Sequence, residues 1–374
     1  MNKQQQIIEC VPNFSEGVDL NIIRQITNEI EKVEGVKLLD VDPGKATNRT
    51  VVTFVGEPQP VIDAAFLAIQ KAAELIDMSS HKVVKHPEFG FFQVTPSPTP
   101  EEITRFYAEE FYSAKYKAFN NSSLEVQEAD QEFHDAHRED IAVNITKILD
   151  RPLNTLSILD IGCGWGQTLQ YLAKKGARCS GFDPASEAVA YVQSQGLECV
   201  RAGMESMDVF QGRRFDVVLM MNVLEHLADP VRVVNEIIST VLAEGGVLII
   251  EVPNDFNAFQ MAAQQLHGLP EWWVAPPAHL NYFDADSLAA LLKGAGLAMS
   301  HLEASFPMEI FMLMGENYVG NGTLGRLCHE RRMAFETNLR KLGKGELLSA
   351  FYQSLAGLNL GRQVIAYAKK GEVK

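Results

Sequence analysis

The chain has 374 residues, of which 46% are hydrophobic and 22% charged, and its formal net charge is −15. This composition predicts two or three folded domains with real cores and argues against a disordered chain. The negative charge argues against a nucleic acid partner and against binding to an anionic membrane. Five cysteines without C-x-x-C spacing are typical of reduced thiols, and no signal peptide or membrane span is recognisable, so we expect a cytoplasmic protein.

The first 80 residues alternate short apolar runs with helical periodicity. An apolar run over 6–14 precedes isoleucines at helical spacing from Ile22 to Ile30. Two further apolar runs, 36–42 and 50–58, flank the turn-forming stretch PGKATN, and Pro58 begins a second helical pattern. The order βαββα predicts a small α+β module of ferredoxin-like type that lacks one strand.

The stretch FGFFQV (89–94) has two interpretations. It is either the missing strand of the small module or the first β-segment of the next domain. The prolines that follow it interrupt regular structure, and the spacing of aromatic and charged residues over 101–149 then predicts mostly helix. We therefore expect a module over 1–86, a linker and helical lead-in over 87–150, and a second domain over 151–374.

From Ser157 onward, apolar runs alternate with helical patterns. This succession predicts a doubly wound, mostly parallel sheet of α/β class. Two late runs, MEIFMLMGE (308–316) and GRQVIAYAKK (361–370), are interpreted as further strands, antiparallel at the sheet edge.

A glycine-rich turn follows the first strand of this sheet. Gly162, Gly164 and Gly166 are spaced G-x-G-x-G, whereas a dinucleotide site requires G-x-G-x-x-G. Asp160, just before the turn, would repel a pyrophosphate and favour an ammonium group. Asp183 ends the second strand, 23 residues after Asp160, where a carboxylate suits ribose hydroxyls. The site therefore fits S-adenosylmethionine (SAM), which combines a ribose with a cationic amino acid and has no phosphate.

The ordered motifs ILDIGCGWG, GFD, FDVVLMMNVLEHLADP, VPN and PAHLNYFDADSLAALLKGAGL resemble class I SAM-dependent methyltransferases over about residues 87–374. The resemblance implies a seven-stranded Rossmann-like sheet. It also implies a set of cofactor-binding residues: Asp160 and the turn Gly162, Cys163, Gly164 and Gly166 at the methionine end, Asp183 at the ribose, Met204 and Glu205 at the adenine, and Asn222 near the methyl. For Met204, core packing is the equal alternative.

Methyl transfer from a sulfonium requires an aligned nucleophile and, for oxygen or nitrogen, a base. The candidate catalytic residues are His226, after the fourth strand, and His279, in a Pro-rich loop after the fifth; a structural role is the alternative for each. Some quinone-precursor O-methyltransferases bind a divalent metal through E-x-x-E-H at this place. Here Asn222 replaces the first glutamate, so we predict no tightly bound metal.

We expect four aromatic residues after the fifth strand to form the wall of a substrate pocket: Phe256, Trp272, Trp273 and Tyr282. For the two tryptophans, the buried core is the equal alternative.

The first module resembles the formiminotransferase N-terminal subdomain over about residues 6–82, through ECVPNFSEG, LLDVDPGKATNRTVVTFVGEP and ELIDMSSHK. That family transfers a formimino group from N-formiminoglutamate to tetrahydrofolate, and its catalytic histidine would fall on His81. The family needs two subdomains for its folate pocket, whereas this chain continues as a methyltransferase. An incomplete module leaves an open strand edge and an apolar face, which favours a homodimer.

The predicted function is methyl transfer from SAM to a small-molecule or saccharide-type acceptor, with an appended formiminotransferase-like module that is inactive. Two alternatives remain open at this point. One is a folate-dependent glutamate formiminotransferase, and the other is a SAM-binding scaffold without catalytic activity.

Overall fold

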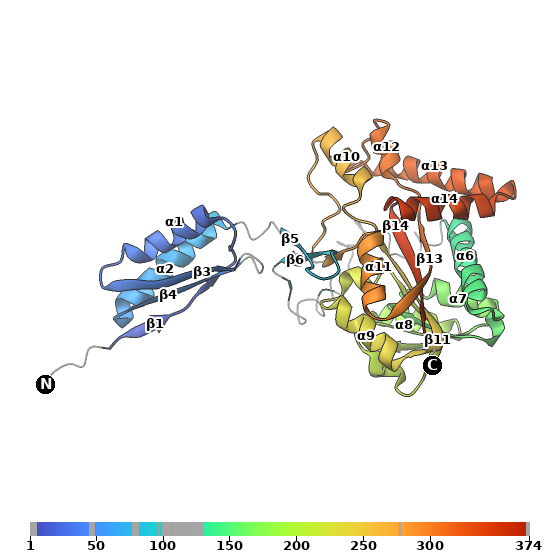
Figure 1. Ribbon diagram of the computed structural model, residues 1–374, viewed down its shortest axis with the longest axis horizontal. Helices are drawn as coiled ribbons and strands as arrows, with labels where there is room; N and C mark the ends of the chain where they lie inside the picture. Colours follow the sequence, from blue (N-terminus) through green and yellow to red (C-terminus); the bar gives the residue numbers. More distant parts are fainter. Residues whose placement is uncertain are drawn as a thin grey trace. The chain divides into compact units, whose positions relative to one another are not determined.

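The structure, a computed structural model, describes residues 6–44, 49–76, 82–95, 97–98, 106, 124, 130–276 and 278–371. These form two compact units, Met1–Val84 with Gln93–Ser97 and Lys85–Phe92 with Pro98–Lys374 (Figure 1). His81 lies outside the described residues, and so does most of the stretch 101–129 that was predicted to be helical.

The first unit is a four-stranded antiparallel sheet with two helices. Its elements are β1 Ile8–Cys10, β2 Asn13–Phe14, α1 Leu20–Glu31, β3 Val36–Gly44, β4 Arg49–Gly56 and α2 Pro58–Leu75. The strand β4 is central, because it pairs with β3 along one edge and with β1 and then β2 along the other. The predicted βαββα order is confirmed, with the first apolar run divided into two strands.

Both helices of the first unit pack on the same face of the sheet, where Figure 1 shows them side by side. Alternation along β4 turns Val52 and Phe54 toward Ile26 and Ile30 of α1 and Val61 of α2. The side chain of Asp19 caps α1 by accepting hydrogen bonds from two backbone N–H groups, and Pro58 begins α2 at a position where no N–H is needed. Local sequence signals and burial therefore agree throughout this unit.

The stretch 82–95 forms two short strands, β5 Lys82–Lys85 and β6 Phe92–Thr95, which are neighbours in a separate small sheet. In the described part of the chain, β6 is not a strand of the four-stranded sheet. Phe91 is 1% exposed and packs on Phe283, with ring centroids 4.6 Å apart, inside the core of the second unit. Residues 85–92 therefore fit the second interpretation, an aromatic lead-in to the second domain.

The second unit contains a seven-stranded sheet in the order β13-β14-β11-β10-β7-β8-β9. The strands are β7 Ser157–Ile161, β8 Arg178–Asp183, β9 Glu198–Arg201, β10 Phe215–Met221, β11 Leu242–Pro253, β13 Leu297–Ala304 and β14 Gln363–Lys370. The five strands from β11 to β9 pair in parallel, and β14 is antiparallel to β11 and β13. The chain runs outward from β7 to β9 and returns to β10, so the switch point lies between β7 and β10.

Helices cover both faces of this sheet, and each face has its own core. On one face Leu159, Val218 and Leu248 meet α9 and α11; on the other, Ile158 and Val217 meet α6 and α7. The helices are α6 Gln131–Leu149, α7 Gln167–Lys174, α8 Ser186–Ser194, α9 Pro230–Thr240 and α11 Ala285–Gly294. The predicted doubly wound α/β fold is confirmed.

The remaining elements of this unit lie mostly between β11 and β14. They are α10 Ala258–His267, β12 Asn281–Tyr282, α12 Glu309–Leu313, α13 Gly322–Lys341, α14 Gly345–Gly357 and the 3₁₀ helices Leu153–Thr155, Met207–Phe210 and Leu224–His226 (η4).

The prediction of a strand over 308–316 is wrong, because this stretch contains α12. Phe311 packs on Phe306 in a cluster with α13 and α14, and the edge of the sheet is taken by β13 instead. The strand predicted over 361–370 is β14; it is antiparallel as expected, but it lies one strand in from the edge.

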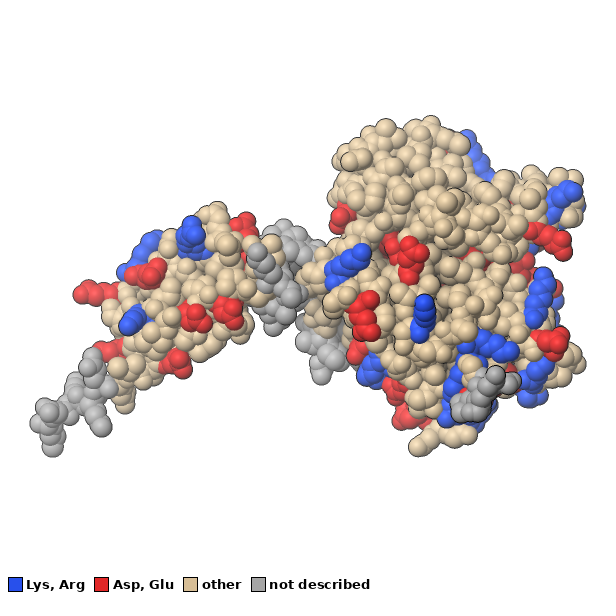
Figure 2. Space-filling model, viewed as in Figure 1, with Lys and Arg blue, Asp and Glu red and all other residues tan. Residues whose placement is uncertain are grey.

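Acidic and basic side chains are interspersed on both units on the face seen in Figure 2. Within the described residues, every helix is too short or too polar to span a membrane.

Candidate functional site

The glycine turn lies at the switch point, directly after β7. Gly162, Gly164 and Gly166 have φ angles of +67°, +51° and +66°. The N–H groups of Gly162 and Cys163 donate hydrogen bonds of 2.9 and 3.2 Å to the carbonyl of Phe182 on β8. A Cβ atom at Gly162 or Gly166 would approach a valine methyl to 2.7 or 2.6 Å, whereas at Gly164 nothing lies within 4 Å. The turn therefore depends on glycine for its conformation at three positions and for close packing at two.

Two buried carboxyl groups flank this turn. Asp183 accepts hydrogen bonds of 2.8 Å from the N–H groups of Gly164 and Ala185, so it joins the end of β8 to the turn. Asp160 is 3% exposed, and its Oδ1 has no hydrogen-bond partner among the described residues. Burial and the negative charge of Asp183 raise the pKa of Asp160 to about 8. Burial also raises the pKa of Asp183, against the effect of its two backbone hydrogen bonds.

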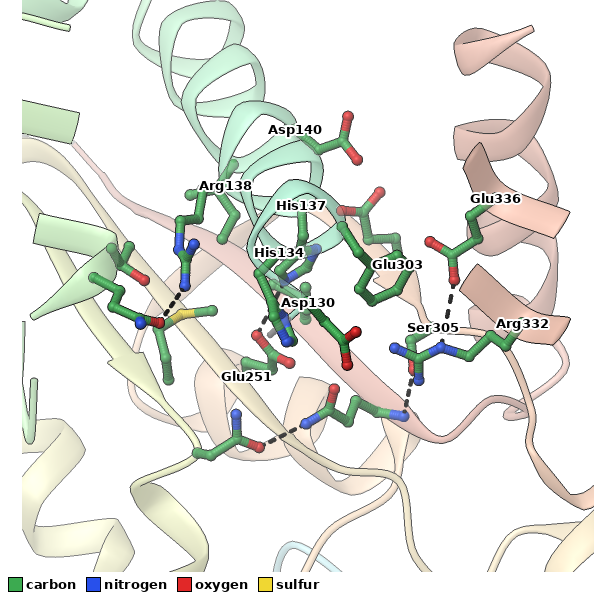
Figure 3. A pocket seen from close by; sticks show the side chains of 18 of the residues that line it. Asp130, His134, His137, Arg138, Asp140, Glu251, Glu303, Ser305, Arg332 and Glu336 are labelled. Carbon is green, nitrogen blue, oxygen red and sulfur yellow. Dashed lines mark hydrogen bonds and ion pairs between the residues drawn. The ribbon is translucent and has the colours of Figure 1, made fainter. Parts of the chain in front are cut away.

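A cavity of about 700 Å³ opens from the glycine turn. Its walls come from α6, the carboxyl ends of β7, β10 and β11, the end of β13, and α13 and α14 (Figure 3). The charged and histidine residues of this lining are Asp130, His134, His137, Arg138, Asp140, Asp160, Glu251, Glu303, Arg326, His329, Arg332, Glu336 and Arg340. The turn is therefore one end of a large polar site.

Most charges on the wall of the cavity are paired. Arg138 donates hydrogen bonds to Asp135 (2.8 Å) and Gln167 (2.7 Å), and Arg340 forms a bidentate pair with Asp140. The imidazole Nε2 of His137 lies 3.3 Å from Oε2 of Glu251. In Figure 3, His134 and His137 project from α6 into the cavity, one helical turn apart. These pairs fix the shape of the wall.

The structure brings most of the predicted cofactor residues to this cavity: Asp160, Gly162, Cys163, Gly164, Gly166 and Asn222 all line it. Asn222 has φ +56°, and its Oδ1 accepts a 2.8 Å hydrogen bond from Gln363. Asp183, Met204 and Glu205 are not among the described lining residues. Met204 lies behind Gly162, with its sulfur 3.5 Å from the place of a Cβ there, and Glu205 pairs with Arg232.

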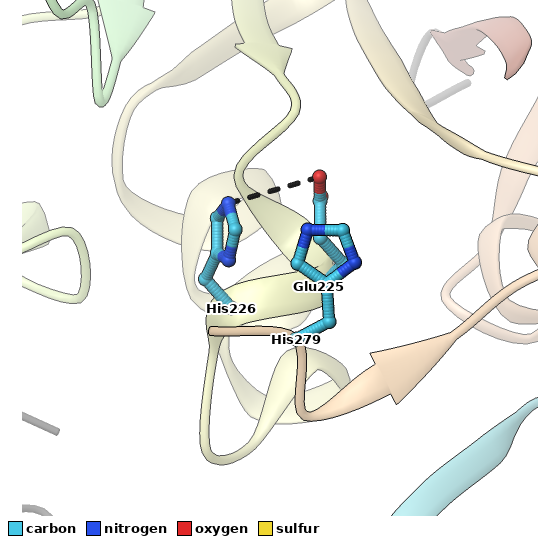
Figure 4. Close-up of side chains that lie close together, drawn as sticks. All are labelled: Glu225, His226 and His279. Atoms are coloured by element: carbon cyan, nitrogen blue, oxygen red, sulfur yellow. Dashed lines mark ion pairs between the residues drawn. The ribbon is translucent and has the colours of Figure 1, made fainter. Parts of the chain in front are cut away.

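The two histidines predicted for catalysis lie together, but outside the described lining of the cavity. His226 and His279 have ring centroids 5.0 Å apart, next to Glu225 (Figure 4). His226 Nδ1 is 2.6 Å from the carbonyl of Ala278. Burial lowers the pKa of His226 to about 4 and, with the charges of His226 and Arg362, that of His279 to about 3. Both imidazoles are therefore neutral at pH 7.

Glu225, His226 and His279 also have the residue types of a metal site. One ligand atom from each lies within 4.8 Å of the others, and Oε2 of Glu225 is buried without a hydrogen-bond partner in the described structure. Burial raises the pKa of Glu225 well above its usual value. The absence of a tightly bound metal stays a prediction.

The four aromatic residues after β11 form a cluster of their own. Phe256 contacts Trp273 and Tyr282 edge to face, at 5.4 and 5.9 Å, and Trp272 packs on Trp273. Trp273 and Tyr282 are buried, and the described lining of the cavity includes none of the four. For Trp273, the core alternative therefore fits better.

Sequence reasoning missed the polar wall, above all His134, His137, Glu251 and Arg332. A signal for part of it was present: His134 and His137 share a helix face with Ile141, and Glu251 lies near the carboxyl end of a central strand. No local sequence pattern predicts that the helix with His137 pairs with the strand that contains Glu251.

The fold and this site indicate the class: the second unit has the Rossmann-like fold of SAM-dependent methyltransferases. Residues 133–302 match the family model described as a methyltransferase domain. Residues 7–108 match the formiminotransferase domain, N-terminal subdomain. The chain therefore joins a region that matches a formiminotransferase N-terminal subdomain to a region that matches a methyltransferase domain.

Individual relatives match one part or the other. Formimidoyltransferase-cyclodeaminase of Mus musculus is 50% identical over 91 residues, 24% of this chain and 17% of that protein. Glutamate formimidoyltransferase of Thermoplasma acidophilum is 47% identical over 90 residues, 24% of this chain and 29% of that protein. Ubiquinone biosynthesis O-methyltransferase of Azorhizobium caulinodans is 33% identical over 162 residues, 41% of this chain and 62% of that protein. The chain thus spans less than a third of these two formimidoyltransferases.

Among solved structures, magnesium protoporphyrin IX methyltransferase from Synechocystis PCC 6803, with bound SAH, is similar at 14% identity and a TM-score of 0.44, over 72% of this chain and all of that one.

Proposed function

We propose that the second unit transfers the methyl group of SAM to a hydroxyl group of a neutral, polar small molecule of saccharide type. The observation that carries this proposal is a single cavity with two chemically different ends. One end has the glycine turn and the carboxyl group of Asp160, whose Oδ1 has no hydrogen-bond partner in the described structure, and the other has a wall of paired acids and bases.

The cofactor end fits SAM through its donor and acceptor groups. The carboxyl group of Asp160 would accept a hydrogen bond from the ammonium group of the methionine part, which would replace the missing partner of Oδ1. Asp183 uses one lone pair on each oxygen for Gly164 and Ala185, which leaves further lone pairs for ribose hydroxyls. When bound, SAM supplies the electrophilic methyl and the leaving group.

The charge of the cavity selects the acceptor class. Among the described residues that line it are six carboxyl groups and four arginines. This excess of acid favours a cationic cofactor and opposes a second anionic ligand such as a phosphate or a carboxylate. The many hydrogen-bonding groups of the wall favour a hydroxylated acceptor, because each hydroxyl both donates and accepts.

Two measurements test this function. Calorimetric titration with SAM is expected to give one site per chain, and labelled SAM is expected to methylate one member of a panel of neutral glycosides and polyols. Phosphorylated sugars with the same carbon skeletons serve as the control panel for these neutral acceptors. Absence of SAM binding by folded protein would overturn the cofactor assignment, and exclusive methylation of the phosphorylated panel would overturn the acceptor class.

A second candidate function, formimino transfer, is favoured by the 50% identity of the first unit to a formimidoyltransferase-cyclodeaminase. We propose that this module is inactive here, because the residues that follow it match a methyltransferase domain and not the second subdomain that the formiminotransferase family needs for its folate pocket. Incubation with N-formiminoglutamate and tetrahydrofolate is expected to give no transfer. Transfer that His81→Ala abolishes would contradict this.

A further inference from the structure

We propose that His137, held by Glu251, is the general base that takes the proton from the acceptor hydroxyl during methyl transfer. This inference rests on the proposed function and adds a catalytic residue to it. It assigns the chemistry to the polar wall of the cavity and not to His226 or His279.

The position of Glu251 links this pair to the cofactor end of the cavity. Glu251 is near the carboxyl end of β11, in register with Met221 of β10. Its carbonyl oxygen accepts a 2.8 Å hydrogen bond from the N–H of Asn222, which lines the cavity beside the glycine turn. The carboxyl group of Glu251 is therefore at the same sheet edge as the residues expected near the methyl group.

The pair leaves one ring nitrogen of His137 available. If Nε2 donates its hydrogen to Oε2 of Glu251, at 3.3 Å, then Nδ1 carries the lone pair. In the described structure, this bond to Glu251 is the one hydrogen bond of the ring. The side chain of His137 is 37% exposed and lines the cavity, while that of Glu251 is 7% exposed. A buried carboxylate that orients an accessible imidazole is the arrangement of a catalytic base with its positioning residue.

Methyl transfer and removal of the hydroxyl proton occur in a single displacement step. As the acceptor oxygen forms its bond to the methyl carbon, its O–H proton passes to Nδ1 of His137. The C–S bond breaks, and its electron pair stays on sulfur in S-adenosylhomocysteine (SAH). The imidazolium formed at His137 is stabilised by Glu251 and then loses the proton to water.

The surrounding charges make the imidazole of His137 a stronger base. Desolvation lowers the pKa of His137, but the hydrogen bond and charge of Glu251, with the charges of Glu303 on β13 and Asp140 on α6, raise it overall. His134, the other histidine of this helix face, has a pKa lowered to about 4 by burial and by Arg138, so it adds no positive charge at pH 7. The arginine nearest to Asp140, Arg340, is neutralised by that acid.

The first test needs no acceptor, because SAM and SAH differ by one methyl group and one positive charge. NMR titration of histidine-labelled protein gives the pKa of His137 with each ligand bound, its signal assigned by its loss in His137→Gln. A sulfonium facing the imidazole is expected to lower this pKa by at least about half a unit relative to SAH. Equal values with both ligands bound would overturn the proposal, whereas failure of both to bind would overturn the proposed function itself.

The second test uses the glycoside acceptor that supports turnover. His137→Gln is expected to lower kcat about 10²-fold or more and to leave the KM for SAM unchanged. Glu251→Gln is expected to move the acidic limb of the pH–rate profile to lower pH, since it removes the charge that raises the pKa of His137.

A matched control is His301→Gln, which removes a histidine paired with Glu303 at 3.0 Å but outside the described cavity lining. The variant is expected to retain kcat, and in the unmodified protein the NMR signal of His301 is expected to shift equally with SAM and SAH. A loss of kcat in His301→Gln as large as in His137→Gln would indicate a structural role for both and would overturn the assignment.

Discussion

The two units differ in where they have residues with positive φ, buried polar atoms without a hydrogen bond, and exposed apolar side chains. In the described part of the first unit, Gly35 is the one residue with a positive φ, and no buried side-chain polar atom lacks a hydrogen bond. The second unit has positive φ at the glycine turn, at Asn222 and at Phe256, and it buries unpartnered atoms such as Oδ1 of Asp160. The unusual feature of the first unit is at its surface, where α2 exposes large apolar side chains.

This difference separates two kinds of function. Strained backbone and unpartnered buried polar groups cost free energy, so they persist where a ligand or a reaction needs them. Exposed apolar side chains cost little in an isolated unit but favour contact with another surface. The second unit therefore has the properties of a ligand site, whereas the exposed apolar side chains of α2 leave the predicted homodimer to be tested.

The largest effect is expected at the glycine turn. Gly166→Ala combines a left-handed backbone with a Cβ 2.6 Å from Val192, which together should lower the free energy of unfolding by about 2–5 kcal/mol. Gly164→Ala is the matched control, because it has the same strain with no contact within 4 Å and should cost only about 1–2 kcal/mol. Denaturant unfolding measures both. Equal losses would mean that the packing against Val192 does not constrain the turn.

Asp160→Asn should weaken SAM binding but stabilise the ligand-free protein at high pH. The substitution removes the charge that is to meet the ammonium group of SAM, and affinity should fall about 30- to 150-fold. Because the pKa of Asp160 is raised to about 8, the folded protein holds a proton there that the unfolded chain releases above about pH 4. The stability from this group is therefore lost as pH rises through 8. At pH 9 the ligand-free variant should melt at least about 2 °C higher than the unmodified protein.

Proton release on SAM binding tests whether Asp160 is the group that loses the proton. Titration of the unmodified protein with SAM at pH 7, in buffers of different ionisation enthalpy, should show a proton released on binding, and Asp160→Asn should release less. Equal proton release by both proteins would rule out Asp160 as the titrating group.

Asp183→Ala should have an effect on binding of the same size or smaller. The loss of a charge-assisted hydrogen bond to the ribose is expected to weaken SAM binding by about 1.5–3 kcal/mol. The variant also frees the N–H groups of Gly164 and Ala185, so its folding must be checked by its melting temperature. Calorimetry with SAM measures the affinity, and an unchanged value would remove Asp183 from the ribose site.

Local patterns predicted most of the fold and the cofactor end of the site. The turn from Gly162 to Gly166 is contiguous, and Asp160 and Asp183 end adjacent strands, so strand order alone brings them together. The error over 308–316 has a known cause, since a short apolar run fits a strand or a buried helix equally well.

The polar wall could not be predicted, because its contacts join segments distant in sequence. His137 and Glu251 are 114 residues apart, and Arg340 and Asp140 are 200 apart. His226 and His279 illustrate the converse: they follow β10 and β11 as expected, but η4 directs His226 to the carbonyl of Ala278 and away from the described cavity lining.

The smallest expected effect concerns the surface of the first unit. Ile62, Phe66 and Ile69 lie on one side of α2 and are 56%, 60% and 59% exposed. If this surface forms the predicted homodimer, Phe66→Glu should shift the protein toward monomer in sedimentation velocity, since a charge at an apolar contact opposes association. Its stability should change by less than about 0.5 kcal/mol, because the site is exposed. Asn28→Asp adds the same charge to an exposed polar position of α1, outside this surface, and should leave the association unchanged. A protein that is monomeric before any substitution would refute the homodimer, and the apolar surface would then need a different partner.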